Sequence, residues 1–168
     1  TMGGTVVTYA GSFDPRLAWE IVAAEGVNIM MVIGDAMVGP LTDALLDGGV
    51  RRSDLPELRA IVSGGVTLSP LVRRRAMEAL PGVKIVDAIG STEAGRQGQL
   101  VFEGAERDGG YGRFLVDDDT AVFDEHFHVI PPGSEKEGRL ARRGHVPLGY
   151  YKDPEKSAAT FPVIEGTR

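Results

Sequence analysis

The sequence predicts an α/β fold, in which a parallel βαβ sheet region is followed by a short antiparallel or barrel-like β region. Apolar runs alternate with helix-like segments along residues 1–96, and this alternation is typical of a parallel sheet with right-handed crossovers. From residue 97 to residue 168 helical spacing fades, turn residues become dense and the apolar runs shorten. The 23 glycines also favour many turns over a helical bundle.

Pairs of a capping residue and a proline mark the expected start of two helices in residues 1–96, at Asp14-Pro15 and Ser69-Pro70. A third helical stretch begins at Gly34, and we expect an interruption at Gly39-Pro40 because proline removes a backbone donor. The strands expected between the helices are residues 5–9, 28–33, 58–62 and 83–87.

The later part of the chain carries short β-like pieces and one further helix start, at Asp153-Pro154. We therefore predict two parts of one domain: a βαβ part over residues 1–96 and a β-rich part over residues 97–168. The expected β pieces are residues 99–102, 113–116, 121–123, 127–130 and 138–142.

Composition and charge narrow the class of protein. Hydrophobic residues make up 42% and charged residues 25% of the chain, as in an ordinary globular domain. The net charge of −6 argues against nucleic acid as a partner. The absence of cysteine excludes disulfides and a cysteine nucleophile and favours a reducing, cytoplasmic location. No apolar run approaches about 18 residues, so no transmembrane segment is predicted. Neither end resembles a natural boundary, and we expect a piece of a larger protein.

The stretch most informative about function follows the expected strand that ends at Asp87. Ligands of open α/β sheets bind at the carboxyl ends of the strands. Gly90 allows close approach of the backbone, the Thr92 hydroxyl suits a phosphate oxygen, and the Glu93 carboxylate suits Mg²⁺ beside phosphates. A purely structural alternative stays open: Ser91 or Thr92 caps a following helix and Glu93 lies in its first turn.

Three other clusters carry weaker signals. Asp124, His126 and His128 alternate along the chain and could ligate a metal from one strand face, but no fourth ligand is evident and an exposed alternating strand is the favoured explanation. The arginines at 73–75 cannot share one helix face, so we expect most to be solvated. The aspartates at 117–119 predict a solvated turn.

The order of three motifs resembles that of the adenylate-forming superfamily, in particular fatty-acyl and steroid side-chain acyl-CoA synthetases. The motifs are residues 63–69 (Ser-Gly-Gly-Val-Thr-Leu-Ser), 89–93 (Ile-Gly-Ser-Thr-Glu) and 149–157 (Gly-Tyr-Tyr-Lys-Asp-Pro-Glu-Lys-Ser). The resemblance covers nearly the whole chain. It implies the central part of the large N-terminal AMP-binding domain of an acyl-CoA synthetase.

The resemblance implies an ATP-dependent ligase that converts a long-chain fatty or steroid-like carboxylic acid to acyl-AMP and then to acyl-CoA. The implied cofactors are ATP or AMP, Mg²⁺ and coenzyme A. The phosphate loop, the ribose-binding motif and the catalytic lysine of the family lie outside this chain, so we expect the isolated chain to be inactive. Because neighbouring parts of the domain would be missing, we also expect self-association of the truncated chain.

The resemblance also assigns roles to individual residues. It implies that Thr92 contacts the α-phosphate and that Glu93, the metal ligand, acts with it in catalysis. Val66 is bulkier than the usual alanine, Ile89 replaces the usual aromatic residue beside adenine, and Tyr150 belongs to a turn without a catalytic role. The implied cofactor-binding residues are Gly64, Gly65, Val66, Asp87, Ala88, Ile89, Gly90, Ser91 and Thr92.

Two alternatives remain at the level of sequence. An acyl-AMP ligase would pass the acyl group to a carrier protein in place of coenzyme A. A non-catalytic nucleotide-binding or interaction module would use the same fold, and Ile89 in place of an aromatic residue favours it.

Overall fold

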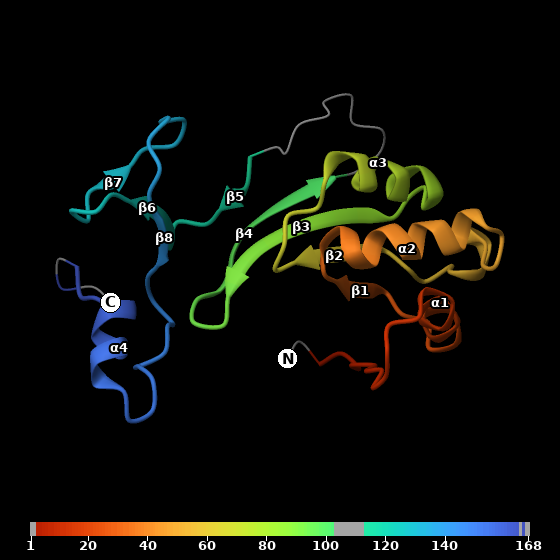
Figure 1. Ribbon diagram of the computed structural model, residues 1–168, viewed down its shortest axis with the longest axis horizontal. Helices are drawn as coiled ribbons and strands as arrows, with labels where there is room; N and C mark the ends of the chain where they lie inside the picture. The colour runs from red at the N-terminus through yellow and green to blue at the C-terminus, as the bar shows by residue number, and fades with distance from the viewer. Residues whose placement is uncertain (1–2, 103–112, 165, 167–168) are drawn as a thin grey trace. The chain divides into compact units, whose positions relative to one another are not determined.

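The computed structural model describes residues 3–102, 113–164 and 166 (Figure 1). The chain groups into two compact units. The first unit comprises Thr1–Asp87 and Leu100–Gly112, and the second comprises Ala88–Gln99 and Arg113–Arg168. Helices and a sheet with a parallel strand pair dominate the first unit, and short antiparallel strands dominate the second, which confirms the predicted α/β class.

Two helices of the first unit begin where capping residues and prolines predict them. Helix α1 (Pro15–Ala24) starts at Asp14, whose Oδ1 accepts a hydrogen bond from the Arg16 amide at 2.9 Å. Helix α3 (Pro70–Ala79) starts at Ser69, whose hydroxyl accepts from the Val72 amide. Each side chain satisfies an amide that the first helical turn leaves without an internal partner.

Helix α2 (Gly34–Leu46) runs through Pro40, so the expected interruption at Gly39-Pro40 is wrong. Glycine before the proline has no Cβ to clash with the proline ring, which removes part of the steric penalty. Val38 and Leu41 flank the pair and are each 1% exposed. Their burial outweighs the single backbone hydrogen bond that Pro40 cannot donate.

A five-stranded sheet has the order β1-β2-β3-β4-β5, and β1 pairs parallel with β2. Residues 5–9, expected as a further strand, lie outside the helices and strands and are exposed. An apolar run without a pairing partner does not form a stable strand. A short 3₁₀ turn, Arg52–Asp54, precedes β2. The strands are β1 (Ile29–Val32), β2 (Ala60–Gly64), β3 (Lys84–Ser91), β4 (Gly95–Phe102) and β5 (Leu115–Val116).

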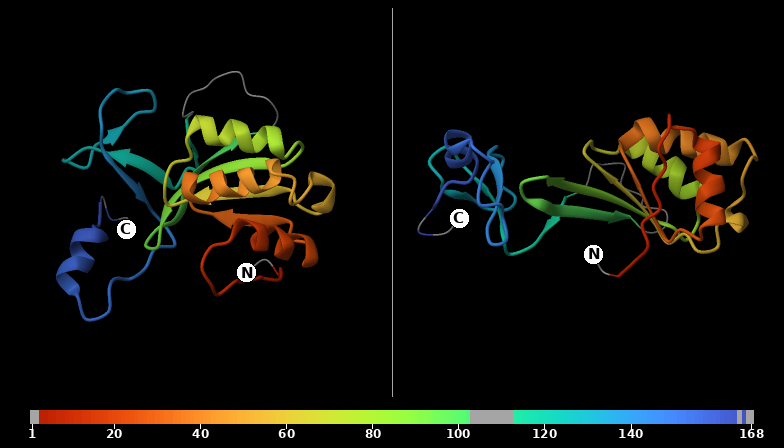
Figure 2. Two further views of the ribbon diagram at one scale, coloured as in Figure 1. Left: turned by 45° about the vertical axis from the view of Figure 1, so that its right-hand side comes forward. Right: turned by 90° about the horizontal axis from the view of Figure 1, so that it is seen from below.

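The core of the first unit lies between the sheet and helices α2 and α3, which lie side by side over one face of it (Figure 2). Ile85 is fully buried there, Leu41 and Ile61 are each 1% exposed, and Trp19 of α1, which packs against α2, is also fully buried. The Trp19 indole Nε1 donates a hydrogen bond to the Leu41 carbonyl at 2.9 Å. The indole therefore fills the core without leaving a polar atom unpaired.

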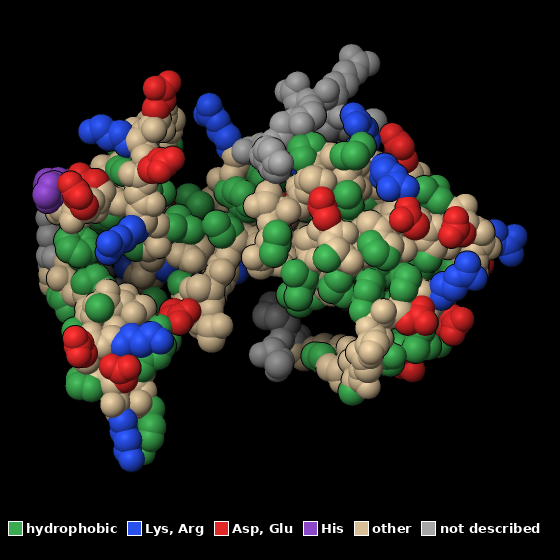
Figure 3. All heavy atoms as spheres, viewed as in Figure 1, with side chains coloured by type: hydrophobic (Ala, Val, Ile, Leu, Met, Phe, Trp, Pro, Cys, Tyr) green, Lys and Arg blue, Asp and Glu red, His purple; other side chains and the backbone are tan. Residues whose placement is uncertain are grey.

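Two of the three arginines of α3 are solvated as expected, because Arg74 is exposed and the Arg75 side chain is 42% exposed, and Arg73 is the exception. Arg73 is 4% exposed, and its guanidinium lies 3.8 Å from the centroid of the Phe102 ring. Stacking on an aromatic face is a geometry that a planar guanidinium adopts readily. Arg75 forms a salt bridge with Asp43 of α2 at 2.6 Å. On the face drawn in Figure 3, acidic and basic side chains are interspersed rather than separated by sign.

Strand β3 turns directly back into β4, and the expected helix after Ser91 is not formed. The Ser91 hydroxyl accepts a hydrogen bond from the Ala94 amide at 3.1 Å, which closes a turn rather than capping a helix. Gly95 has φ +66° and completes the reversal. A Cβ at Gly90 would overlap the Gly95 carbonyl, so the hairpin requires glycine there. The helix-cap alternative is therefore wrong.

The second unit contains an antiparallel sheet of order β7-β6-β8. Val122 of the central strand lies opposite Ile130 on one side and Leu140 on the other. Asp153 accepts a hydrogen bond from the Lys156 amide at 3.0 Å and starts the last helix as predicted. The elements are β6 (Thr120–Phe123), β7 (Val129–Ile130), β8 (Arg139–Arg142) and α4 (Pro154–Thr160). No helix in the described residues is long and apolar enough to cross a membrane.

Candidate functional site

In the first unit, Gly64, Gly65 and Val66 form the turn that follows β2. Gly65 has φ +81° and open space where a Cβ would stand, so the backbone there is accessible to a ligand. Val66 is 60% exposed. Its Cβ lies 3.3 Å from the point that a Cβ on Gly34 would occupy, which places the valine over the start of α2.

Asp87 is the buried carboxylate of the first unit and is 3% exposed. Its Oδ2 accepts a hydrogen bond from the Leu68 amide at 3.3 Å. Burial raises the pKa of the Asp87 carboxyl, and the Leu68 hydrogen bond and the charge of Arg73 oppose that rise. Asp87 lies in the middle of β3, and a buried acid with a perturbed pKa is the kind of group found at functional sites.

Replacing Asp87 by asparagine is expected to raise the melting temperature at pH 7 by roughly 2–4 °C. The raised folded-state pKa means that folded Asp87 binds its proton more tightly than the unfolded chain does. Stability is therefore greatest below the ordinary aspartate pKa of 3.8 and falls as pH rises through the folded-state pKa. Thermal melts at several pH values test this: the difference between Asp87→Asn and the parent should vanish near pH 3.8. Asp118→Asn, at an exposed position, is the control.

In the second unit, Ala88 to Thr92 form the outer half of β3 and the beginning of the hairpin turn. Ala88 is half-buried, and Ile89 is 39% exposed. A Cβ on Gly98 of β4 would stand 3.2 Å from Ile89 Cγ2, so the isoleucine lies across that glycine. Ser91 is used in the turn, and Thr92 is exposed at its tip. The threonine can therefore offer its hydroxyl to a ligand.

Glu93 lies next in the turn, and its Oε1 accepts a hydrogen bond from the Tyr150 hydroxyl at 2.6 Å. This bond, more than any other contact, lowers the pKa of the Glu93 carboxyl, and the charge of Lys156 adds to the effect. The same bond raises the pKa of the Tyr150 hydroxyl. Tyr150 is therefore a site residue that the sequence reasoning missed. The signal was the motif 149–157, which was interpreted as a structural turn.

The oxygen chemistry of this turn fits a magnesium ion. Mg²⁺ is commonly held by one or two carboxylates together with substrate phosphates and water, rather than by a cage of protein ligands. Glu93 offers an ionised carboxylate, and Thr92 offers a hydroxyl beside it. The part of the chain that the structure describes contains no cluster of three or more histidines, cysteines or acids that could hold a metal alone. A single carboxylate that acts with phosphate oxygens matches this donor set.

A cavity of about 580 Å³ opens beside the turn within the second unit. Ser91, Glu93 and Gln97 line it from the hairpin, and Leu140 and Phe161 contribute apolar surface from β8 and the end of α4. Its size is that of a typical small-molecule site. Glu93 thus faces a space large enough for part of a ligand.

The alternative metal cluster at Asp124 is explained by a turn. Asp124 Oδ1 accepts hydrogen bonds from the backbone amides of His126 at 2.9 Å and His128 at 2.8 Å. The His128 amide bond is the main cause of the lowered pKa of the Asp124 carboxyl. The carboxylate therefore closes the connection between β6 and β7, which favours the structural interpretation over metal binding.

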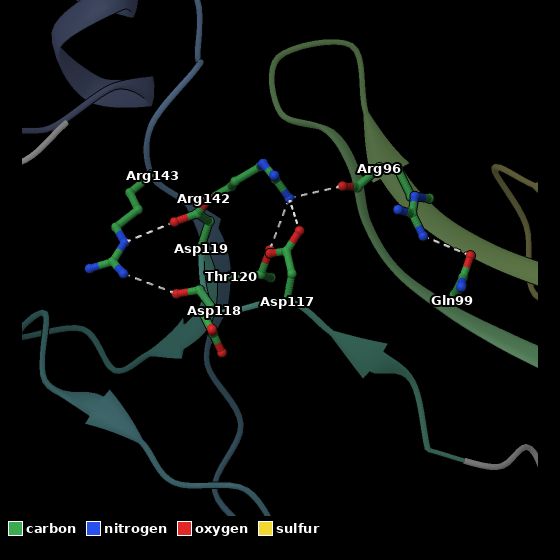
Figure 4. A network of polar contacts seen from close by, with 8 residues as sticks. All are labelled: Arg96, Gln99, Asp117, Asp118, Asp119, Thr120, Arg142 and Arg143. Carbon is green, nitrogen blue, oxygen red and sulfur yellow. Dashed lines mark hydrogen bonds and ion pairs between the residues drawn. The ribbon is translucent and has the colours of Figure 1, made fainter. Parts of the chain in front are cut away.

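The aspartates at 117–119 lie in an exposed turn, as expected, and also take part in a network of polar contacts (Figure 4). Arg142 Nη1 donates to Asp117 Oδ2 at 2.8 Å and to the Arg96 carbonyl at 3.1 Å. The Arg142 hydrogen bond is the main cause of the lowered pKa of the Asp117 carboxyl. Arg143 pairs with Asp119 at 3.2 Å. Arg142 therefore fixes the base of the hairpin strand β4 against the sheet β7-β6-β8.

Comparison with known proteins agrees with this geometry. The family model described as "AMP-binding enzyme" matches residues 1–151. The chain is 38% identical to the 3-oxocholest-4-en-26-oate–CoA ligase of Rhodococcus rhodochrous, over 99% of this chain and 30% of that protein. It is 40% identical to the medium-chain acyl-CoA ligase Mig of Mycobacterium avium, over 100% of this chain and 30% of that protein.

A solved structure from Rhodopseudomonas palustris that bears the name long-chain-fatty-acid CoA ligase has the same fold. The TM-score is 0.70 at 24% identity, and the match covers 93% of this chain and 36% of that one. The chain spans about 30% of the length of the curated relatives that it matches. The match to the family model covers well over half of the chain, and the chain therefore belongs to the AMP-binding enzyme family.

Proposed function

We propose that this chain is part of an acyl-CoA ligase, an acid–thiol ligase that activates a carboxylic acid with ATP. In the first step an oxygen of the acid attacks the α-phosphorus of ATP, acyl-AMP forms and pyrophosphate leaves. In the second step the thiol of coenzyme A attacks the acyl carbonyl and AMP leaves. The observation that carries the proposal is the ionised Glu93 carboxylate beside Thr92, at the end of β3 in a member of the AMP-binding family.

The residues of the first unit are proposed to bind the nucleoside. The open backbone at Gly64 and Gly65 would lie along the nucleotide, with Val66 beside it. Asp87 would accept a hydrogen bond from the amino group of adenine, which is a donor that a buried carboxylate can satisfy. The burial of Asp87, which its contacts with Leu68 and Arg73 offset only in part, supports this role, because an adenine amino group would offset more of the desolvation cost.

The residues of the second unit are proposed to bind the phosphate end. Ala88, Ile89, Gly90 and Ser91 would present backbone and an aliphatic side chain to the nucleotide. Thr92 would donate its hydroxyl to an α-phosphate oxygen. Glu93 would ligate Mg²⁺, which supplies positive charge to the phosphates when it is bound. The residue's part is to keep an ionised oxygen in place as charge develops in the transition state.

The substrate class is proposed from the names of the relatives, which include a steroid-acid ligase and a medium-chain acyl ligase. We propose a fatty or steroid-like carboxylic acid and a cytoplasmic location. Residues 1–96 and 97–168 would be two parts of one AMP-binding domain. This chain alone would be inactive, because the phosphate loop and catalytic lysine expected of the family lie outside it.

In the first unit, Ile29 and Met31 of β1 are 59% and 78% exposed, and Ile33, which follows the strand, is 57% exposed. We propose that other parts of the complete protein cover these side chains. The isolated chain is therefore expected to self-associate through them. Light scattering over a concentration series tests this, and a monomer at every concentration would contradict it.

Product analysis of the complete protein tests the proposed function. Purified enzyme with ATP, Mg²⁺ and a panel of fatty and steroid acids is offered either coenzyme A or an acyl-carrier protein. The proposal predicts acyl-CoA by mass spectrometry with coenzyme A. Acyl-carrier product without acyl-CoA would instead identify an acyl-AMP ligase. Nucleotide binding without any acyl product would identify a non-catalytic module.

A further inference from the structure

We propose that Tyr150 is a positioning residue for the proposed metal ligand Glu93. Its hydroxyl holds one carboxylate oxygen, Oε1, and so orients the carboxylate for the divalent cation. The inference rests on the proposed role of Glu93 as that ligand, and the experiment below separates the two.

The hydrogen bond between the two residues is well suited to fixing a side chain. The Tyr150 hydroxyl lies 2.6 Å from Glu93 Oε1, the distance of a strong bond to a charged acceptor. Glu93 projects from the hairpin turn between β3 and β4. A glutamate has three side-chain torsions, and the tyrosine contact restricts them from a position 57 residues later in the chain.

Tyr150 is itself held rigidly by α4. Its backbone amide donates to the Ser157 hydroxyl at 2.8 Å. Its ring lies 5.7 Å from the Phe161 ring, and the Lys156 ammonium lies 4.2 Å from the Tyr150 ring centroid. A Cβ on Gly149 would meet the Ser157 hydroxyl at 2.7 Å, so glycine allows this close approach. Residues 149–157 therefore hold the backbone and the ring of Tyr150 in place, and we call this arrangement the clamp.

The clamp has a consequence for how the carboxylate can bind a metal. A carboxylate has two oxygens with about four acceptor positions in all. The Tyr150 hydroxyl occupies one position on Oε1, the Glu93 amide and the Ser91 hydroxyl also bond to the carboxylate, and the acceptor positions that remain can take a cation. Such partners orient a ligating carboxylate, and removing one typically lowers metal affinity by about 10–100-fold. Tyr150 would thus influence metal binding without touching the metal.

The substitution Tyr150→Phe isolates the hydroxyl from the rest of the side chain. Phenylalanine keeps the ring contacts with Phe161 and Lys156 and removes the hydroxyl, which bonds to Glu93 and also contacts the Thr160 side chain. The adjacent Tyr151 provides a matched control, because it is 88% exposed and its ring lies 5.2 Å from the Lys152 ammonium. Tyr151→Phe makes the identical chemical change one residue away.

The test measures metal affinity directly in the complete protein. Mn²⁺ replaces Mg²⁺, a non-hydrolysable ATP analogue is present, and electron paramagnetic resonance counts the free Mn²⁺. Tyr150→Phe is expected to raise the Kd for Mn²⁺ about 10-fold, whereas Tyr151→Phe changes it less than twofold. In steady state, the KM for Mg²⁺ should rise with Tyr150→Phe while the KM for the carboxylic acid stays unchanged. A thermal melt within about 2 °C of the parent shows that the fold is intact.

The outcomes separate the positioning role of Tyr150 from the proposed metal-binding role of Glu93. An unchanged Kd for Mn²⁺ in Tyr150→Phe, or an equal change in Tyr151→Phe, would overturn the positioning role. The variant Glu93→Gln is measured in parallel and should weaken Mn²⁺ binding more than Tyr150→Phe does. If Glu93→Gln binds Mn²⁺ as tightly as the parent, the metal role of Glu93 fails and the inference fails with it.

Discussion

Glu93→Gln is expected to lower the rate of acyl-adenylate formation by about 10²–10³-fold. The amide has nearly the same shape as the carboxylate, and it loses the negative charge and the hard anionic oxygen that Mg²⁺ prefers. The Tyr150 hydrogen bond to Oε1 can persist with the amide oxygen, so the fold of the turn is preserved. The measurement is acid-dependent release of pyrophosphate by the complete protein at saturating ATP.

A second acidic residue controls for the loss of one negative charge. The side chain of Glu125 is 84% exposed and lies in the turn between β6 and β7. Glu125→Gln should change the rate less than twofold, because solvent and salt screen an exposed charge. A rate for Glu93→Gln within threefold of the parent would remove Glu93 from the proposed metal site.

Trp19→Ala is expected to lower the free energy of unfolding by about 3–5 kcal/mol. The Trp19 side chain is fully buried, and its removal would leave a large cavity between α1 and α2. The Leu41 carbonyl, which accepts a hydrogen bond from the Trp19 indole, would also lose its partner inside the core. Chemical denaturation of the complete protein, followed by circular dichroism, measures the change.

Two variants bracket the tryptophan prediction. Trp19→Phe keeps most of the apolar volume and loses the indole N–H, so its cost should be smaller, about 1–2 kcal/mol. Val6→Ala, at a position that is 77% exposed, should change stability by less than about 0.5 kcal/mol. A loss below 1 kcal/mol in Trp19→Ala would show that this core is not the main support of the first unit.

The sequence alone predicted three helix starts, because each depends on a side chain that caps backbone amides only a few residues away. Asp14, Ser69 and Asp153 each cap the helix that the following proline predicts. Such caps are decided by neighbours in the sequence, so a single sequence contains the information. The short strands after residue 96 were also predictable, because turn residues separate them.

Features that depend on distant partners were not predictable from the same signals. Arg73 is buried because Phe102, far along the chain, offers its ring face. Residues 5–9 have strand-like composition and find no pairing partner among the described residues. A single sequence gives neither the partner nor its absence, since both are set by tertiary packing.

In the candidate site, too, features set by neighbours in the sequence were predictable and features set by distant partners were not. The glycine, hydroxyl and carboxylate at 90–93 were recognised from their types and spacing, but Ser91 closes a hairpin turn instead of a helix start. The local residues permit either structure, and the close approach of Gly90 to the Gly95 carbonyl decides between them. The contact of Tyr150 with Glu93 joins two motifs through residues that lie 57 positions apart in the sequence, so only the fold reveals it.

The most direct test of the central claim is exchange of labelled pyrophosphate into ATP by the complete protein. This exchange reports reversible adenylate formation alone, whatever the later acceptor of the acyl group. The proposed function predicts exchange that requires both Mg²⁺ and a fatty or steroid-like carboxylic acid. Binding of ATP without exchange, across the whole panel of acids, would contradict adenylate formation and leave a nucleotide-binding module on the AMP-binding fold.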